Sequence, residues 1–292
     1  MVLKDSYDRP VSNVRISLTP QCNLSCIYCH REGERKTGEQ LPAEEIAEIL
    51  KTAAHFGVRS VKFTGGEPLL RPDLIEIIGS VPKGMESSIT TNGTLLANLA
   101  SDLKQAGLSR VNVSLDSLNR ETYKKITGTD RLGDVLEGIA AALKSGLTPV
   151  KLNMVVLKDV NSAEIDDFLA FVRNNRNLVL QLIELMDFNN CPSHDELSTL
   201  EGELAARSKQ IITRRMHHRK KYCLEGAEVE VVRPLHNTEF CAFCNRLRVT
   251  SDGKLKPCLL RTDNHIDIRH KKGAELEELF KKAVALREPF YK

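Results

Sequence analysis

The chain has 292 residues, and 42 Lys and Arg against 39 Asp and Glu give it a formal net charge of +3. So small a charge gives no electrostatic reason to expect binding to nucleic acid or to a membrane surface. A chain of this length can bury a sizeable core and forms one large domain or two modest ones. Charged residues interrupt the N-terminal segment, and no uncharged apolar run reaches about 18 residues, so we expect a cytoplasmic protein without signal peptide or membrane span.

Short apolar, β-branched runs alternate with helical patterns along the chain. The strand-like runs are 14–18, 61–63, 88–91, 111–115, 150–157 and 178–185. The helical patterns lie near 42–56, 72–80, 95–106, 134–145, 163–173 and 195–210. Alternation of this kind predicts six βα units, with a parallel sheet and right-handed crossovers.

The predicted strands are apolar on one face only. Parallel strands that are covered on both faces usually read as continuous apolar runs. Here Arg15, Lys62 and Lys151 fall between apolar neighbours, and period-two alternation places all three on the polar face. The pattern predicts an α/β fold, an incomplete (βα)6 TIM-type barrel whose lumen is wet and binds anions.

Six of the eight cysteines fall in two triplets. Cys22, Cys26 and Cys29 form C-x3-C-x2-C directly after the first strand, where ligands gather in such folds. The second triplet, Cys241, Cys244 and Cys258, forms C-x2-C-x13-C. Each set suits either a zinc site completed by a nearby histidine, such as His30, or a cubane iron–sulfur cluster that keeps one iron without cysteine. Cys191 and Cys223 stand apart and are interpreted as bystanders, with Cys223 as a fourth ligand of a triplet as the alternative.

Longer motifs carry a family resemblance. The run Cys22-Asn-Leu-Ser-Cys26-Ile-Tyr28-Cys29, with Thr64-Gly-Gly-Glu-Pro68, Thr90-Thr-Asn-Gly93 and Val113-Ser-Leu-Asp-Ser117, resembles the radical S-adenosylmethionine superfamily. The run Cys241-Ala-Phe-Cys244-Asn-Arg246-Leu-Arg248, with Asp252-Gly253 and Cys258, resembles the GTP 3′,8-cyclases of molybdenum cofactor (molybdopterin) biosynthesis within that superfamily. The resemblance covers about residues 10–268.

The resemblance implies two [4Fe–4S] clusters and S-adenosylmethionine as cofactors. Cys22, Cys26 and Cys29 would hold the cluster that binds S-adenosylmethionine, and Cys241, Cys244 and Cys258 a second cluster beside the guanine of GTP. The positions expected to contact S-adenosylmethionine are Tyr28, Gly66, Ser114 and Met186. Those expected to contact GTP are Arg15, Lys62, Thr90, Lys151, Arg246, Leu247 and Arg248. The implied reaction uses a 5′-deoxyadenosyl radical to convert GTP to (8S)-3′,8-cyclo-7,8-dihydro-GTP.

The resemblance also implies an organisation and partners. Residues 1–225 would form the partial barrel, and residues 226–292 a C-terminal iron–sulfur domain that binds GTP and closes the open side. The expected partners are an electron donor and the cyclic pyranopterin monophosphate synthase that takes the product. A homodimer is a further expectation, and neither nucleic acid nor a membrane is expected.

Several positions depart from the family pattern or fit no role. Ser60 and Gln181 stand where many members carry a basic residue, and the sequence ends in Glu288-Pro-Phe-Tyr-Lys292 where members usually end in Gly-Gly. The basic run at 214–221 suggests either an RNA or phosphate patch or a solvated linker or helix face, and the second interpretation is preferred because no aromatic stacking platform accompanies it. Glu184 could enter the lumen as a proton-handling group or as the partner of a lysine.

Two other functions compete with the cyclase interpretation. One is a radical S-adenosylmethionine enzyme that acts on a peptide or another small molecule, with the second cluster as an electron relay. The other is a non-catalytic protein that binds zinc or a nucleotide.

Overall fold

The computed structural model describes residues 2–33, 40–173, 175–186, 195–235 and 237–290. Within these ranges the strands form one sheet of twelve, ordered β12-β11-β10-β1-β2-β3-β4-β5-β6-β9-β8-β7. The central strands pair in parallel and in chain order. They are β1 (Asn13–Ser17), β2 (Ser60–Thr64), β3 (Glu86–Thr91), β4 (Arg110–Ser114), β5 (Val150–Val156) and β6 (Leu178–Glu184). These are the six predicted strands, so the α/β partial-barrel prediction is confirmed.

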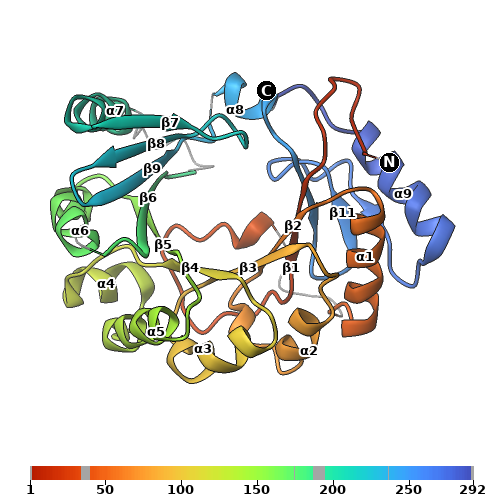
Figure 1. Ribbon diagram of the computed structural model, residues 1–292, viewed down its shortest axis with the longest axis horizontal. Helices are drawn as coiled ribbons and strands as arrows, with labels where there is room; N and C mark the ends of the chain where they lie inside the picture. The colour runs from red at the N-terminus through yellow and green to blue at the C-terminus, as the bar shows by residue number, and fades with distance from the viewer. Residues whose placement is uncertain (1, 34–39, 174, 187–194, 236, 291–292) are drawn as a thin grey trace.

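The crossover helices cover the outer, convex side of this curved sheet (Figure 1). They are α1 (Ala43–His55), α2 (Leu74–Gly79), α3 (Leu96–Gln105), α5 (Leu132–Lys144) and α6 (Ile165–Val172), and α7 (Asp195–Arg207) follows β6. All six match predicted helical patterns. The sequence analysis missed α4 (Arg120–Thr127), a two-turn helix whose N-terminal N–H groups are capped by the Asn119 side chain.

The C-terminal part of the chain extends the sheet at both edges, which the sequence did not predict. At one edge β10 (Arg246–Val249) pairs in parallel with β1, followed by β11 (Lys254–Lys256) and β12 (Ile266–Asp267). At the other, β9 (Ala227–Val232) pairs in parallel with β6 and continues into β8 (Lys220–Leu224) and β7 (Gln210–Thr213). The expected boundary at 225/226 falls in the turn between β8 and β9, and the division into two domains stays a prediction.

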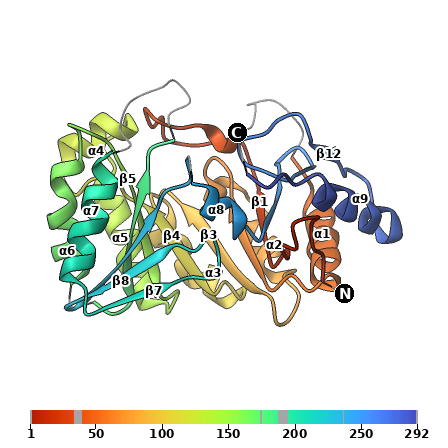
Figure 2. The ribbon, with the colours of Figure 1, turned by 90° about the horizontal axis from the view of Figure 1, so that it is seen from above.

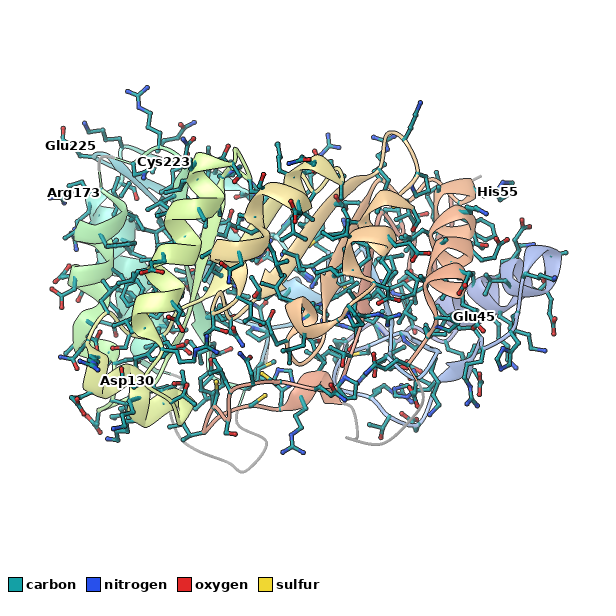
Figure 3. The ribbon with its side chains drawn as sticks, turned by 90° about the horizontal axis from the view of Figure 1, so that it is seen from below. Glu45, His55, Asp130, Arg173, Cys223 and Glu225 are labelled. Atoms are coloured by element: carbon teal, nitrogen blue, oxygen red, sulfur yellow. The ribbon has the colours of Figure 1, made fainter. Side chains whose placement is uncertain are left out.

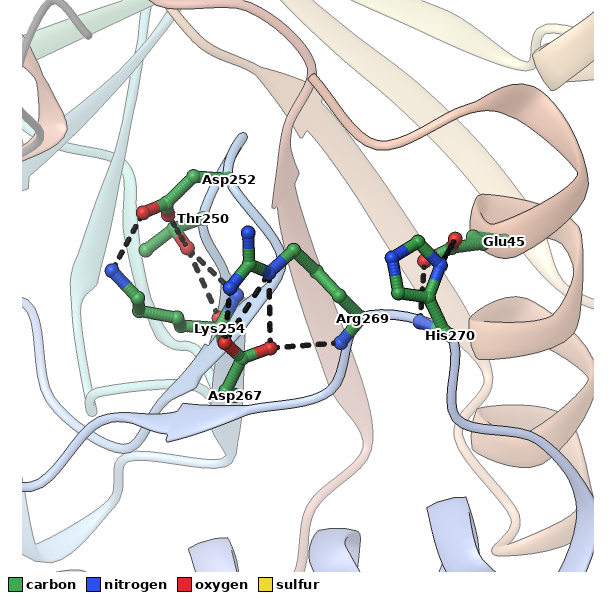
Figure 4. A network of polar contacts seen from close by, with 7 residues as sticks. All are labelled: Glu45, Thr250, Asp252, Lys254, Asp267, Arg269 and His270. Atoms are coloured by element: carbon green, nitrogen blue, oxygen red, sulfur yellow. Dashed lines mark hydrogen bonds and ion pairs between the residues drawn. The ribbon is translucent and has the colours of Figure 1, made fainter. Parts of the chain in front are cut away.

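The C-terminal region also contains the helices α8 (Thr238–Ala242) and α9 (Gly273–Ala285). Figure 2 shows α8 between the two flanking groups, with α9 beside α1. The loop before α9 is fastened to α1, because His270 places Nδ1 2.8 Å from Glu45 Oε1 and donates its backbone N–H to Glu45 Oε2 (Figure 4). Among the described helices, none has the length and apolar character needed to cross a membrane.

The hydrophobic core lies between the sheet and its helices. Val14, Ile16, Val61 and Phe63 are fully buried on the helix-facing side of β1 and β2. The residues between them face the opposite side, as the period of two requires. The apolar side chains of each strand therefore form the core, and the polar side chains on the opposite face can form a site.

Candidate active site

The polar face of the barrel bounds a cavity of about 770 Å³. Residues from all six barrel strands line it, together with the loops that follow β1, β2 and β6 and with segments of the C-terminal region. Both cysteine triplets open into this one cavity. Chemistry at the two triplets can therefore act on a single bound molecule.

All but one of the predicted site residues line this cavity. Those that do are Cys22, Cys26, Cys29, Cys241, Cys244, Cys258, Tyr28, Gly66, Ser114, Met186, Arg15, Lys62, Thr90, Lys151, Arg246 and Arg248. Leu247 does not, because it lies between Arg246 and Arg248 on β10 and its side chain is fully buried in the hydrophobic core. Its side chain therefore cannot be the group that contacts GTP.

The first triplet sits on the loop after β1, against the loop after β2. Gly66 donates its N–H to Thr19 O at 2.7 Å, and a Cβ at Gly66 would lie 2.1 Å from Gln21 O. Only glycine allows the two loops to approach this closely. Next to it, the buried Glu67 accepts from the Thr91 hydroxyl and the Asn92 N–H, both at 2.7 Å. Burial raises the pKa of Glu67 to about 7.

The environment of the first triplet disfavours free thiolates. Burial raises the pKa of Cys26 to about 12, and the charges of Asp116, Cys29 and Cys22 act in the same direction. Burial likewise raises the pKa of Cys22. Thiolates at such a site need a positively charged metal partner. The donor set therefore fits an iron–sulfur cluster.

The cysteine spacing also bears on the kind of metal group. Within the described ranges, no three His, Cys, Asp or Glu side chains converge on a point where one metal ion could bind. In a cubane cluster each cysteine binds a different iron, so the thiols of a triplet need not converge.

Tyr28 and Asp116 form a buried pair beside the first triplet. The Tyr28 hydroxyl donates to Asp116 Oδ2 at 2.6 Å, and Val155 N donates to Asp116 Oδ1 at 2.8 Å. Burial raises the pKa of Asp116 to about 6. The resemblance assigned no role to Asp116, although this residue lies in one of the motifs. Its carboxylate holds the hydroxyl of Tyr28, a residue expected at the S-adenosylmethionine site.

A row of cations crosses three neighbouring strands. The register places Arg15 between Arg248 on β10 and Lys62 on β2. Glu32 bridges two of them, at 2.6 Å from Arg15 and 3.2 Å from Arg248. Lys151 lies 2.6 Å from Glu230 on β9. Sequence analysis missed both acids, because Glu32 lies in a loop and the edge to which β9 pairs was unknown.

Of the five cations that were predicted to contact GTP, Lys62 and Arg246 have no acidic partner among the described residues. Arg246 donates from Nε to Asn13 Oδ1 at 2.8 Å, a neutral acceptor. Burial lowers the pKa of Lys62 well below its usual value, and Arg15, Arg246 and Lys151 lower it further. A bound anion would relieve this repulsion, so the cavity suits a ligand with several negative charges.

The remaining predictions have mixed outcomes. The interpretation of 214–221 as a solvated linker or helix face is wrong, because the run spans the β7–β8 hairpin turn and five of its residues line the cavity. Ser60 and Gln181 also line the cavity. Glu184 faces it too, and accepts the N–H of Leu235 at 3.2 Å.

The two isolated cysteines lie away from the site or outside the described residues. Cys223 is in β8, paired with Gln210, and is not among the cavity-lining residues. Figure 3 shows it near Arg173 and Glu225, at the outer end of the sheet. This placement excludes Cys223 as a fourth ligand of either triplet. Cys191 lies outside the described residues.

The sequence matches two protein-family models, one after the other along the chain. Residues 16–172 match the radical SAM superfamily, and residues 178–292 match Molybdenum Cofactor Synthesis C. A protein of Methanocella arvoryzae named "Probable GTP 3′,8-cyclase" is 51% identical over 293 residues, which cover 100% of this chain and 95% of that protein. A protein of Archaeoglobus fulgidus with the same name is 48% identical, with 100% of both chains covered.

Solved structures share the fold at low sequence identity. Streptococcus suis SuiB bound to S-adenosylmethionine superposes with a TM-score of 0.70 at 17% identity, covering 94% of this chain and 65% of that one. Methylornithine synthase (PylB) gives 0.58 at 16% identity, covering 93% and 80%. These likenesses show the fold alone. The family models and the close relatives together show that this chain belongs to the radical S-adenosylmethionine superfamily and, within it, to the GTP 3′,8-cyclase family.

Proposed function

We propose that the protein converts GTP to (8S)-3′,8-cyclo-7,8-dihydro-GTP, the first step of molybdenum cofactor biosynthesis. The observation that carries the proposal is that one cavity is lined by both cysteine triplets and by Lys62 and Arg246, two cations without an acidic partner among the described residues. A nucleoside triphosphate has the two features this cavity can use: a base that reaches one triplet and a chain of phosphates for the cations.

As a member of this family, the protein uses two [4Fe–4S] clusters and S-adenosylmethionine. Cys22, Cys26 and Cys29 would hold one cluster, and Cys241, Cys244 and Cys258 the other. When bound, these cofactors supply one-electron chemistry that takes the 3′ hydrogen atom from the ribose and joins C3′ to C8 of the guanine.

The chain's own residues bind and orient the two small molecules. Tyr28, held by Asp116, and Gly66, at the contact of two loops, shape the S-adenosylmethionine side. Lys62 and Arg246 offer charge-assisted hydrogen bonds to phosphate oxygens. Positioning both molecules in one cavity keeps the radical next to the ribose.

The reaction also requires partners outside the chain. Cleavage of S-adenosylmethionine takes one electron. The nucleotide radical that remains after the C3′–C8 bond has formed takes a second electron and a proton, so an electron donor must supply two electrons per turnover. We further propose that the product passes to the cyclic pyranopterin monophosphate synthase and that the protein is cytoplasmic, since clustered free cysteines need a reducing compartment. The homodimer stays a prediction.

An anaerobic turnover assay tests the proposal. The protein is reconstituted with iron and sulfide and mixed with S-adenosylmethionine, dithionite and GTP. The expected result is 5′-deoxyadenosine together with a nucleotide of unchanged mass that elutes apart from GTP, because the cyclised product is an isomer of GTP. Production of 5′-deoxyadenosine with unaltered GTP would instead favour a peptide or another small molecule as the substrate.

A further inference from the structure

The basic run at 214–221 forms part of the cavity wall, but none of its residues is among those expected to contact S-adenosylmethionine or GTP. Its cavity-lining residues are Arg214, Arg215, Met216, His217 and Arg219. They come from the turn between β7 and β8, which reaches over the cavity from the edge of the sheet farthest from β12. A ligand that binds to the barrel strands in this cavity can therefore also contact residues of the turn.

The hairpin turn is held in place by stacking on α8. The ring of His217 stacks on Phe240 with centroids 3.7 Å apart, and the His218 ring stacks on Phe243 at 3.2 Å. His217 also donates its backbone N–H to Phe243 O at 2.9 Å. Since α8 carries Cys241, the turn has a fixed position relative to the second triplet.

Arg219 points toward Glu230, but its donors are largely unused. Glu230 is buried, and its two oxygens are already bonded to Lys151 Nζ at 2.6 Å and Gln181 Nε2 at 2.9 Å. Arg219 Nη1 lies 3.6 Å from Glu230, too far for a hydrogen bond. Arg219 Nε is buried and has no acceptor among the described residues. Only 15% of the Arg219 side chain is exposed, so solvent does not replace the missing acceptors fully.

The charges around Glu230 do not balance. Lys151, Arg219 and Arg214 all lie within 4 Å of this one carboxylate. The positive charges of Lys151 and Arg219 also repel the charge of Lys62, because both lower the pKa of Lys62. Burial lowers the pKa of Arg219 itself. An excess of positive charge with unused donors suits a polyanion, and a triphosphate carries about four negative charges near neutral pH.

We propose that Arg219, with Arg214 beside it, is a substrate-binding residue that donates to the phosphate chain of GTP from the hairpin side of the cavity. Glu230 holds Lys151 and Arg219 next to each other, so that both can reach the phosphates. The inference rests on the proposed function, because it requires a nucleoside triphosphate in this cavity.

A series of guanine nucleotides tests the proposal by binding, without turnover. Dissociation constants for GTP, GDP, GMP and guanosine are measured by calorimetry on the anaerobic, cluster-loaded protein. We expect Arg219→Gln to weaken GTP binding by about tenfold or more, to weaken GMP less, and to leave guanosine unchanged. Arg219→Lys should recover part of the loss. The matched control is Lys220→Gln, which removes an exposed charge of the same hairpin outside the cavity and should bind GTP as the wild type does.

Each other outcome has a definite meaning. Wild-type GTP affinity in Arg219→Gln, or an equal loss for guanosine, would overturn the inference and leave the proposed function standing. Absence of GTP binding by the wild type would overturn the proposed function itself. If circular dichroism shows that Arg219→Gln does not fold, Arg214→Gln is used, since that side chain is 43% exposed. A loss that does not depend on the number of phosphates would again overturn the inference.

Discussion

The carboxylate of Glu32 lies 2.6 Å from a guanidinium nitrogen of Arg15, inside the set of cations that face the cavity. It also reaches Arg248 at 3.2 Å and accepts the Thr64 hydroxyl at 3.2 Å. Glu32 follows Cys29 by three residues, so the loop that carries the first triplet also supplies an anion to the cation row. A nucleotide that uses Arg15 or Arg248 has to compete with this carboxylate.

Removing the competing carboxylate should strengthen nucleotide binding. Glu32→Gln keeps the size of the side chain but frees two guanidinium groups, so we expect GTP to bind about threefold to tenfold more tightly. Calorimetry on the anaerobic protein measures the change. Glu278→Gln, which breaks an exposed pair with Lys281, is the control and should not alter the affinity. Equal affinities in wild type and Glu32→Gln would mean that neither Arg15 nor Arg248 contacts the nucleotide.

The Glu32 carboxylate should make the free energy of unfolding depend on pH in the acid range. Burial raises the pKa of Glu32, but the charges of Arg15 and Arg248 outweigh burial and lower it from 4.5 to about 2. A lowered carboxyl pKa stabilises the folded state above the unfolded value of 4.5, and this contribution is lost as the pH falls toward 2.

Urea unfolding of the cluster-free protein tests this sign. Above about pH 5 the wild type should exceed Glu32→Gln in free energy of unfolding by up to about 3 kcal/mol, and the difference should shrink steadily from pH 4.5 downward. A difference that stayed constant between pH 6 and pH 3 would show that Glu32 is not held ionised by the two arginines.

The cysteine assignments predict different results for two single substitutions. Cys22→Ala should lose the iron and sulfide of one cluster and all production of 5′-deoxyadenosine, because Cys22 lines the cavity in the first triplet. Cys223→Ala should keep both, since Cys223 lies in β8 away from the cavity. Iron and sulfide analysis with chromatography of 5′-deoxyadenosine measures the outcome. Normal 5′-deoxyadenosine formation by Cys22→Ala would refute the assignment of the first triplet.

Two glycines should differ sharply in their tolerance of alanine. A Cβ at Gly66 would lie 2.1 Å from the backbone Gln21 O, so Gly66→Ala must push apart the loops after β1 and β2. We expect it to weaken S-adenosylmethionine binding at least about tenfold and to destabilise the fold by about 1–3 kcal/mol. Gly79→Ala meets no atom within 4 Å and lies in α2, so it should be neutral or stabilising by up to about 1 kcal/mol. Thermal unfolding measures the stability of each variant, and equilibrium dialysis measures its affinity for S-adenosylmethionine. Equal stability and equal affinity in the two variants would contradict the close contact between the loops.

The strand pattern alone was enough to place the polar face. Arg15, Lys62 and Lys151 each stand between apolar neighbours, and a period of two leaves only one face for them. The structure confirms this for all three. The motifs after β1 and β2 were equally local, and their glycine and cysteine spacing indicated the site without knowledge of the fold.

Contacts between distant parts of the chain could not be predicted in the same way. Nothing near Leu247 says that β10 pairs with β1, so the sequence could not show that Leu247 faces the core. The partners of Arg219 also depend on where β9 joins the sheet, since Glu230 on β9 pairs with Gln181 on β6. The basic run at 214–221 was therefore predicted to be solvated, although five of its residues line the cavity.

A buried ionic group joins the two ends of the described chain beside the second triplet. Asp5 is fully buried and lies 2.7 Å from Arg9 Nε and 3.2 Å from Arg287 Nη1. Arg9 donates to the carbonyl of Cys241 at 2.9 Å, and Arg287 donates to the carbonyl of Cys244. The carboxylate thus holds two arginines against the backbone that presents two cluster ligands.

Asp5→Asn should therefore affect stability and the second cluster together. It leaves two buried guanidinium groups without their counter-charge, for which we expect a loss of about 3–5 kcal/mol in the free energy of unfolding. The loosened backbone at Cys241 and Cys244 should release iron from the second cluster, while 5′-deoxyadenosine formation at the first continues. Asp8→Asn is the control, because its pair with Lys4 is exposed and should contribute less than about 0.5 kcal/mol. If Asp5→Asn were destabilised but kept its full iron content, the group would support the fold without holding the cluster loop in place.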